Sequence, residues 1–296
     1  MDVTNREIIH RYLRHTKKFP HIFCPGCGNG VVLGALLRAI HETGWDNDDV
    51  VFASGIGCSS RAPVYVDFNT LHTAHGRALA FATGVKLTRP RLNVVVMMGD
   101  GDATGIGGNH LIHACRRNID MTAIIVNNFI YGMTGGQQSP TTPHNALSTT
   151  SIYGTLDQPF RISRLAAAAG ATYVARSTTY HVRELERLMV GAFAHKGFSV
   201  VEAIAACPTC FGRRNKQGGA VEMMRWQKEV AVSTKKAAAM SPAELQGRIV
   251  TGVLVEREAP EYTEQYQKVR EAAAAGKQAI FTPPLGDITR TSGKEY

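Results

Sequence analysis

The sequence predicts an α/β fold with a doubly wound, mainly parallel β-sheet and helices on both faces. Two observations predict it. Short runs of β-branched and other apolar residues alternate with amphipathic stretches of helical length along most of the 296 residues. These short runs are apolar throughout, which is typical of strands that are buried on both faces. One strand and one helix per repeat is the spacing of parallel strands joined by helical crossovers.

Five strands and five helices follow from these patterns. We expect strands at residues 50–54, 93–98, 122–128, 172–176 and 198–206. We expect helices at residues 31–43, 76–88, 108–118, 162–169 and 181–196. The segment between residues 129 and 159 is rich in Gly, Thr, Ser and Pro and has no clear period, so we interpret it as a long functional loop.

The chain is expected to form one main domain with a smaller extension. Residues 1–216 contain all the expected strands and all the residues singled out below, so we assign them to the α/β domain. Residues 217–296 are charged and more weakly patterned. We expect them to form a C-terminal helical extension and tail, with a helix around Val221–Val232.

Composition argues against several classes of protein. The formal net charge is +9, but no nucleic-acid-binding motif accompanies the scattered basic residues. We therefore expect no nucleic-acid partner and favour an acidic protein as the partner of a basic face. No apolar run approaches the roughly 20 residues that span a bilayer, and the N-terminal segment MDVTNREIIHRYLRHTKKFP lacks the apolar core of a secretory signal. We expect a cytoplasmic protein without a membrane partner.

Polar or glycine-rich segments follow four of the expected strands at the point where each strand ends. GIGCSSR follows the strand at 50–54, GDGD follows 93–98, and CPTC follows 198–206. The asparagine pair Asn127–Asn128 ends the strand at 122–128. In open parallel sheets, ligands bind beyond the carboxyl ends of the strands. The sequence therefore predicts that these four segments face one crevice.

The sharpest motif combines Gly99–Gly101, with the sequence GDG, and Asn127–Asn128, which follow after 25 residues. This combination resembles the thiamine diphosphate motif, in which NN follows GDG at such a distance. Mg²⁺ prefers oxygen ligands and usually keeps phosphate oxygens among them, so a carboxylate, an amide oxygen and a backbone carbonyl would complete its shell. In the motif these ligands are Asp100, Asn128 and the carbonyl of Ile130.

Cysteine spacing indicates a second centre. Cys24 and Cys27 form a CxxC pair, and Cys58, Cys207 and Cys210 lie in the segments at the expected crevice. A disulfide framework is not expected in a cytosolic chain. Four cysteines suit either Zn²⁺ or a [4Fe–4S] cluster, and spacing alone does not choose between them. A structural zinc would more often use two CxxC pairs, which would leave Cys58 without a role.

With both centres described, the chain resembles the β subunits of 2-oxoacid:ferredoxin oxidoreductases. The resemblance covers about residues 19–215. It rests on FCPGCGNG, GIGCSSR, HTAHGRALAFATG, MGDGDATGIGGNH, NNFIYGMTGGQQSPTT and CPTCFGRRN, in this order. The most similar subgroup comprises the short two-subunit enzymes that act on 2-oxoglutarate or on a broader range of 2-oxoacids. The fold implied is the thiamine diphosphate-binding type, with an N-terminal segment that binds the cluster.

The resemblance implies an oxidoreductase that decarboxylates a 2-oxoacid in the presence of coenzyme A. For 2-oxoglutarate the products are succinyl-CoA and CO₂, and electrons pass singly through a [4Fe–4S] cluster to ferredoxin, reversibly in principle. The implied cofactors are thiamine diphosphate, Mg²⁺ and the cluster. A pyruvate-specific or broad-specificity enzyme is the first alternative. A thiamine enzyme without electron transfer and a thiamine-independent zinc-binding module are alternatives of other classes.

The resemblance also assigns roles to individual residues. The cluster ligands are Cys24, Cys27, Cys58 and Cys207, with Cys210 as second choice for the fourth. The candidate catalytic residues are His75, Arg77 and Arg61, which could meet a substrate carboxylate or the diphosphate. The residues expected at the thiamine diphosphate cofactor are Gly57, Cys58, Gly99, Asp100, Gly101, Asp102, Asn127, Asn128, Ile130, Tyr131 and Thr134.

Two features concern what the chain lacks. Thiamine enzymes use a glutamate from a second α/β domain, and no such domain is evident in this sequence. We therefore expect an α subunit to supply the glutamate and the second wall of the cofactor site, in an (αβ)₂ assembly. Relatives often carry a lysine where this chain has Gly135 in YGMTGGQ. The resemblance gives that lysine a contact with the substrate carboxylate, so its absence leaves the preferred 2-oxoacid open.

Overall fold

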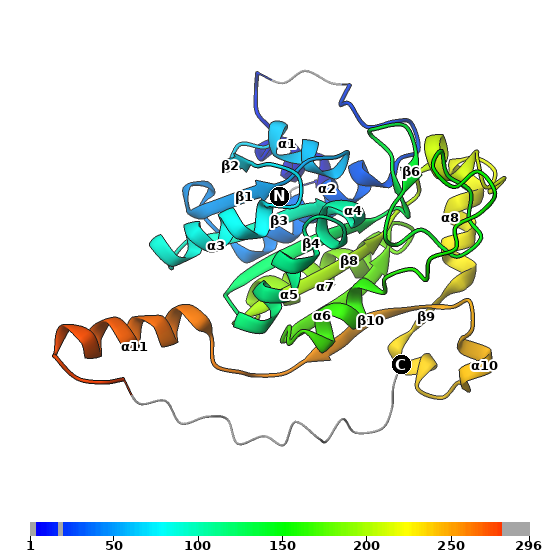
Figure 1. Cartoon of the computed structure of the whole chain (residues 1–296). Helices are drawn as coiled ribbons and strands as arrows, with labels where there is room; N and C mark the ends of the chain where they lie inside the picture. The colour runs from blue at the N-terminus through cyan, green and yellow to red at the C-terminus, as the bar shows by residue number, and fades with distance from the viewer. Residues whose placement is uncertain (1–3, 17–19, 280–296) are drawn as a thin grey trace.

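The computed structural model describes residues 4–16 and 20–279, and it confirms the predicted fold class (Figure 1). An eight-stranded sheet has the order β2-β1-β3-β4-β8-β7-β10-β9. All neighbouring strands are parallel except β10 with β7. The strands of this sheet are β1 (Val50–Ser54), β2 (Asn69–His72), β3 (Asn93–Gly99), β4 (Met121–Asn127), β7 (Tyr173–Thr178), β8 (Phe198–Ile204), β9 (Ala231–Ser233) and β10 (Ile249–Glu256).

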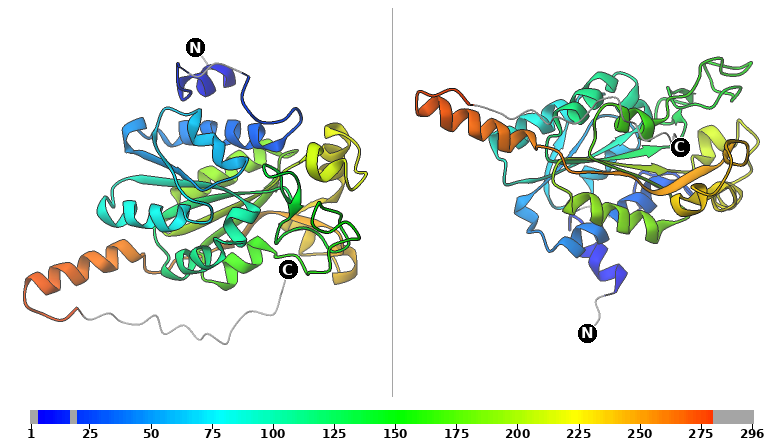
Figure 2. Two further views of the ribbon diagram at one scale, coloured as in Figure 1. Left: turned by 45° about the horizontal axis from the view of Figure 1, so that its top comes forward. Right: turned by 90° about the horizontal axis from the view of Figure 1, so that it is seen from below.

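Helices cover both faces of the sheet (Figure 2). One layer contains α2 (Gly28–Thr43) and α7 (Val182–Ala194), with α1 (Asn5–Arg11) against α2. The other contains α3 (Ala78–Thr88), α5 (Gly108–Arg117) and α6 (Ile162–Ala168). The remaining helices are α4 (Asp100–Thr104), α8 (Ala220–Val230), α9 (Thr234–Ala237), α10 (Pro242–Leu245) and α11 (Tyr262–Ala274). None of the helices in the described ranges is long and apolar enough to span a bilayer.

The apolar runs of the central strands follow from this layering. In β3, Val95 and Met97 pack into the core beneath α2 and α7, whereas Val96 and Met98 pack into the core beneath α3 and α5. Both faces of the strand are therefore removed from water, and no position between Val94 and Met98 is left for a polar side chain. The five strands expected from the sequence are present, with ends shifted by at most two residues.

The strand order creates a crevice at one edge of the sheet. From β1 the chain first adds β2 on one side, and it then adds β3 and β4 on the other side. The loops that leave β1 and β3 therefore run apart, which is the arrangement that opens ligand sites in parallel sheets. A small hairpin of β5 (Ile130–Tyr131) and β6 (Gln137–Gln138) follows β4 at the same edge.

The sequence analysis expected a helical C-terminal extension, whereas the structure has both helices and strands there. The predicted helix is present as α8, but β10 joins the main sheet antiparallel to β7 and extends it beyond residue 216. The pairing contains an irregularity between Val253 and Val255, next to Gly252 with its positive φ of 115°. Residues 280–296 of the expected tail lie outside the described residues, and the domain boundary at 216 stays a prediction.

Candidate functional site

A cavity of about 310 Å³ lies beyond the carboxyl ends of β1, β3 and β4. Its walls come from the loop after β1, the β3–α4 junction and the β5–β6 hairpin. Eleven of the residues predicted for the site line it, namely Gly57, Cys58, His75, Gly99, Asp100, Gly101, Asp102, Asn128, Ile130, Tyr131 and Thr134. The structure therefore brings together residues that are up to 77 positions apart in the chain (57 to 134).

Asp100 is almost fully buried at the start of α4. Its Oδ2 accepts a hydrogen bond of 2.6 Å from the Ser139 hydroxyl and another from the Thr141 hydroxyl. Burial raises the pKa of Asp100 to about 6, although the two hydroxyl groups oppose that shift. A buried carboxylate of this kind is stabilised in its charged form by a cation. The same cavity holds Asn128 and the backbone of Ile130, whose N–H donates to Asn128 Oδ1 at 3.3 Å.

Asp102 is equally buried and fixes the loops that follow β1 and β2. Its Oδ1 accepts hydrogen bonds from the backbone N–H groups of Gly76 at 2.6 Å and Ile56 at 3.4 Å. Burial raises the pKa of Asp102, and the hydrogen bond from Gly76 N–H opposes the shift. A Cβ at Gly55 would lie 2.2 Å from Asp102 Oδ2, so only glycine fits beside this carboxylate.

His75 is oriented by the same carboxylate. Its Nδ1 lies 3.0 Å from Asp102 Oδ1 and 3.2 Å from the carbonyl oxygen of Ile56. Both neighbours are hydrogen-bond acceptors, so Nδ1 carries a proton and Nε2 of the neutral ring is free to accept one. Because His75 lines the cavity, the ring can present Nε2 to a bound molecule.

Three of the residues predicted for catalysis or for thiamine diphosphate binding do not line the cavity. The Asn127 side-chain amide donates a hydrogen bond of 2.8 Å to the buried Glu202 carboxylate, so this side chain joins β4 to β8. Arg77 donates to the carbonyl oxygen of Ile106 at 3.2 Å. Arg61 is half-buried, and its Nε has no hydrogen-bond partner among the described residues. Neither arginine is among the residues that line the cavity.

Five cysteines gather beside the cavity. A Cβ built on Gly132 would lie 3.5 Å from Cys58 Sγ and 3.7 Å from Cys207 Sγ, and Gly132 itself lines the cavity. Burial raises the pKa of Cys58 to about 12, and the neighbouring Cys27, Cys207 and Cys24 contribute to the shift. Burial also raises the pKa of Cys27, with further contributions from Cys207 and Cys24. The four thiols predicted as cluster ligands therefore face one region.

The spacing of these thiols bears on what they could hold. Within residues 4–16 and 20–279, no three His, Cys, Asp or Glu side chains are close enough together to hold a single metal ion. In a tetrahedral zinc site each sulfur ligand lies about 2.3 Å from the ion, so the ligands are close to one another. A cluster of several iron atoms keeps its four thiolate ligands farther apart.

Sequence reasoning missed the hydroxyl groups that hold Asp100. Ser139 and Thr141 lie in the long loop after β6, and their signal was the SPTT stretch inside a segment already interpreted as functional. It also missed Glu202, which is buried on β8 and accepts hydrogen bonds from Asn127 and from the Ser163 hydroxyl. A glutamate in the middle of the apolar run FSVVEAIAA was the available signal.

Comparison with known proteins agrees with this geometry. The family described as thiamine pyrophosphate enzyme, C-terminal TPP binding domain, matches residues 55–203. The protein named 2-oxoglutarate synthase subunit KorB from Methanothermobacter thermautotrophicus is 52% identical over 255 residues, which cover 86% of this chain and 89% of that protein. The protein of the same name from Methanocaldococcus jannaschii is 49% identical over 88% of this chain and 96% of its own length.

A solved structure is similar over nearly the whole chain. It is described as 2-oxoglutarate:ferredoxin oxidoreductase from Magnetococcus marinus with 2-oxoglutarate, coenzyme A and succinyl-CoA bound. It superimposes with a TM-score of 0.80 at 34% sequence identity, covering 92% of this chain and 92% of that chain.

Gly101 is a point at which the cavity tolerates no side chain. A Cβ there would lie 2.1 Å from Cε1 of Tyr131, whose hydroxyl donates to the Gly101 carbonyl. We expect Gly101→Ala to lower the free energy of unfolding by about 1–3 kcal/mol, because the Tyr131 ring must move. Gly108→Ala is the matched control, since Gly108 is also helical and has open space at its Cβ position. Chemical denaturation of both variants checks this, and equal stability of the two would contradict it.

Proposed function

Because this chain belongs to the β subunits of the 2-oxoacid:ferredoxin oxidoreductases, we propose that it binds thiamine diphosphate and Mg²⁺ in the cavity beyond β3 and a [4Fe–4S] cluster beside it. Together with an α subunit, it oxidises 2-oxoglutarate with coenzyme A to succinyl-CoA and CO₂ and passes electrons to ferredoxin. The observation that carries the proposal is the shared wall at Gly132, where the cavity with Asp100 and Asn128 adjoins Cys58 and Cys207.

The diphosphate and its metal ion fit the groups at the β3 edge. Asp100 would supply a carboxylate ligand to Mg²⁺, Asn128 an amide oxygen and Ile130 a backbone carbonyl. Burial makes the charged form of Asp100 costly, and a divalent cation would offset that cost. Gly99 and Gly101 would let the backbone approach the phosphates.

The cluster would take Cys24, Cys27, Cys58 and Cys207. Cys207 is the better fourth ligand because it is an electrostatic neighbour of both Cys27 and Cys58. Cys210 instead contacts the Gly132 carbonyl oxygen through its Sγ at 3.4 Å. When bound, thiamine diphosphate supplies the chemistry of decarboxylation, and the cluster accepts electrons one at a time.

The protein's own side chains would orient the substrate and exclude water. His75, held by Asp102 with Nε2 available, is placed to accept a hydrogen bond in the cavity. Arg61, whose Nε has no partner among the described residues, and Arg77 are proposed to supply positive charge for a carboxylate or the diphosphate.

An α subunit is proposed to close the cavity. Two large apolar side chains that line the cavity remain exposed, with Ile56 at 43% and Met133 at 46%. Exposed apolar side chains at the wall of a cavity are typical of a surface that another chain covers. The names of the relatives as subunits support such a partner. The catalytic glutamate from that chain, the (αβ)₂ state and a cytoplasmic location stay predictions.

The alternatives differ in what they explain. A zinc module would need a set of side chains at single-ion spacing, which the described residues do not contain, and it leaves Asp100 and Asn128 unused. A thiamine enzyme without electron transfer leaves the gathered cysteines unused. A pyruvate-specific or broad-specificity enzyme uses the same site, so substrate preference must be measured.

The experiment that tests the function is reduction of a viologen dye by the anaerobically purified αβ complex. With coenzyme A present, we expect kcat/KM for 2-oxoglutarate to exceed that for pyruvate by about tenfold or more, since a charged subsite discriminates strongly. Omission of coenzyme A is the control. Equal or better use of pyruvate would contradict 2-oxoglutarate as the preferred substrate. If the dye is reduced with neither acid, both substrate assignments would be wrong.

Replacing the proposed magnesium ligands should impair thiamine diphosphate binding without removing the cluster. In the αβ complex, Asp100→Ala or Asn128→Ala should weaken thiamine diphosphate binding by about a hundredfold or more, because a ligand of Mg²⁺ is lost. The visible absorbance of the cluster should remain. Asn127→Ala is the matched control, since that side chain faces Glu202 and should affect stability while binding is kept. Titration calorimetry measures the affinity, and unchanged binding to the Asp100 and Asn128 variants would remove the assignment.

The fourth cluster ligand can be identified by a pair of isosteric changes. Cys207→Ser should abolish the visible absorbance and the bound iron of the complex, because serine does not replace the thiolate. Cys210→Ser should keep both, since Cys210 stands outside the proposed ligand set. The opposite result would make Cys210 the ligand and Cys207 the spare thiol.

A further inference from the structure

A basic turn follows the cysteine-bearing segment after β8. Arg213, Arg214 and Lys216 are exposed, and no ion pair of theirs is found within the described parts of the chain. The sequence has no acidic residue from Ala203 to Val221. Glu222, the next acid along the chain, lies 3.9 Å from Arg225 and accepts a hydrogen bond from Gly219 N–H. The basic turn, Arg213–Lys216, therefore presents positive charge that forms no ion pair with any acidic side chain in the described ranges.

The backbone of this turn is held in place. The Asn215 side chain donates to the carbonyl oxygens of Leu147 and Phe211, and it accepts from Leu147 N–H at 2.7 Å. Gln217 N–H donates to the Gly212 carbonyl oxygen at 2.8 Å. The turn is thus tied to the long loop after β6 and to its own preceding helical segment. Its charges project from a rigid support, which lowers the entropic cost of binding a partner.

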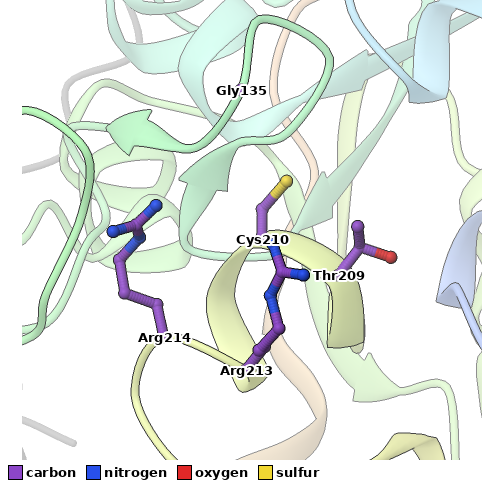
Figure 3. Close-up of a pocket in the computed structure, with 5 residues that line it drawn as sticks. All are labelled: Gly135, Thr209, Cys210, Arg213 and Arg214. Carbon is purple, nitrogen blue, oxygen red and sulfur yellow. The ribbon is translucent and has the colours of Figure 1, made fainter.

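The basic turn lies next to the cysteines. Arg213 and Arg214 line a cavity of about 260 Å³ together with Gly135, Thr209 and Cys210. In Figure 3 the Cys210 sulfur is directed toward the Gly135 loop, with the Arg213 guanidinium group below it and the Arg214 guanidinium group to its left. Cys210 in turn contacts Gly132, beside which Cys58 and Cys207 lie. The positive charge therefore adjoins the place proposed for the cluster.

We propose that the basic turn is the docking site for the electron acceptor, a small acidic one-electron carrier protein of the ferredoxin class. The inference rests on the proposed function, since an acceptor must approach the cluster. Both guanidinium groups are exposed and neither is enclosed, which suits the rim of a protein interface better than a closed pocket for a small anion. Complementary charge of this kind steers encounter and raises the association rate.

The test reverses the charge of the two arginines in the αβ holoenzyme. Arg213→Glu/Arg214→Glu should raise the KM for a ferredoxin of net negative charge by about tenfold or more at low salt, because steering is lost. Reduction of a viologen dye, which needs no docking surface, should be unchanged with the same 2-oxoacid. Arg116→Glu/Arg117→Glu is the matched control, because that pair lies at the end of α5, at the opposite edge of the sheet.

A binding measurement gives a second readout that does not depend on turnover. The dissociation constant of the ferredoxin from the immobilised complex should rise about tenfold for the Arg213/Arg214 variant and stay unchanged for the Arg116/Arg117 variant. Unchanged ferredoxin binding would overturn the proposal. A raised KM for 2-oxoglutarate or coenzyme A in the dye assay would overturn it in favour of a small-molecule anion site. Failure of the unaltered complex to reduce dye with any 2-oxoacid would instead overturn the proposed function, and the binding measurement would still test the docking site.

Discussion

Two buried carboxylates hold the site of this protein together. Removing a carboxylate from water is costly unless hydrogen bonds or charges replace the solvent, and Asp100 and Asp102 are both almost fully buried at the end of β3. The groups that serve Asp102 come from the loops after β1 and β2. Those that serve Asp100 come from the long loop that follows the β5–β6 hairpin. The demand for hydrogen bonds at one strand end therefore positions three separate loops.

Glycines make this convergence possible because they remove the side chains that would collide. Gly55 makes room for the Asp102 carboxylate, and Gly101 makes room for the Tyr131 ring. Gly132 lines the cavity, and a Cβ on it would lie 3.5 Å from Cys58 Sγ and 3.7 Å from Cys207 Sγ, which is ordinary contact distance. Because Cys58 lines the cavity as well, the two proposed cofactor positions share a wall.

Much of the fold and site was predictable from the sequence, for physical reasons that also mark the limits. Strands such as β3 are apolar on both faces because helices cover both, and that pattern is visible without coordinates. The residues at the strand ends converge because parallel strands share one carboxyl edge. The direction of a side chain at a strand end was not predictable, so Asn127 was grouped with Asn128 although it faces Glu202. Strand β10 was missed because Thr251 and Gly252 divide its apolar residues into two short runs.

The cysteines beside the cavity are at positions 24, 27, 58, 207 and 210. Most of them are far apart in the sequence, and only the assembled sheet brings them close together. Bringing such distant segments together requires loop closure that an unfolded chain does not favour. Small zinc domains fold around their metal because their ligands are close in sequence. For the cluster proposed here we expect the reverse order, in which the sheet forms first and brings the cysteines together. Iron and sulfide would then enter a site that the folded chain has already shaped, so the protein is expected to fold without its cluster.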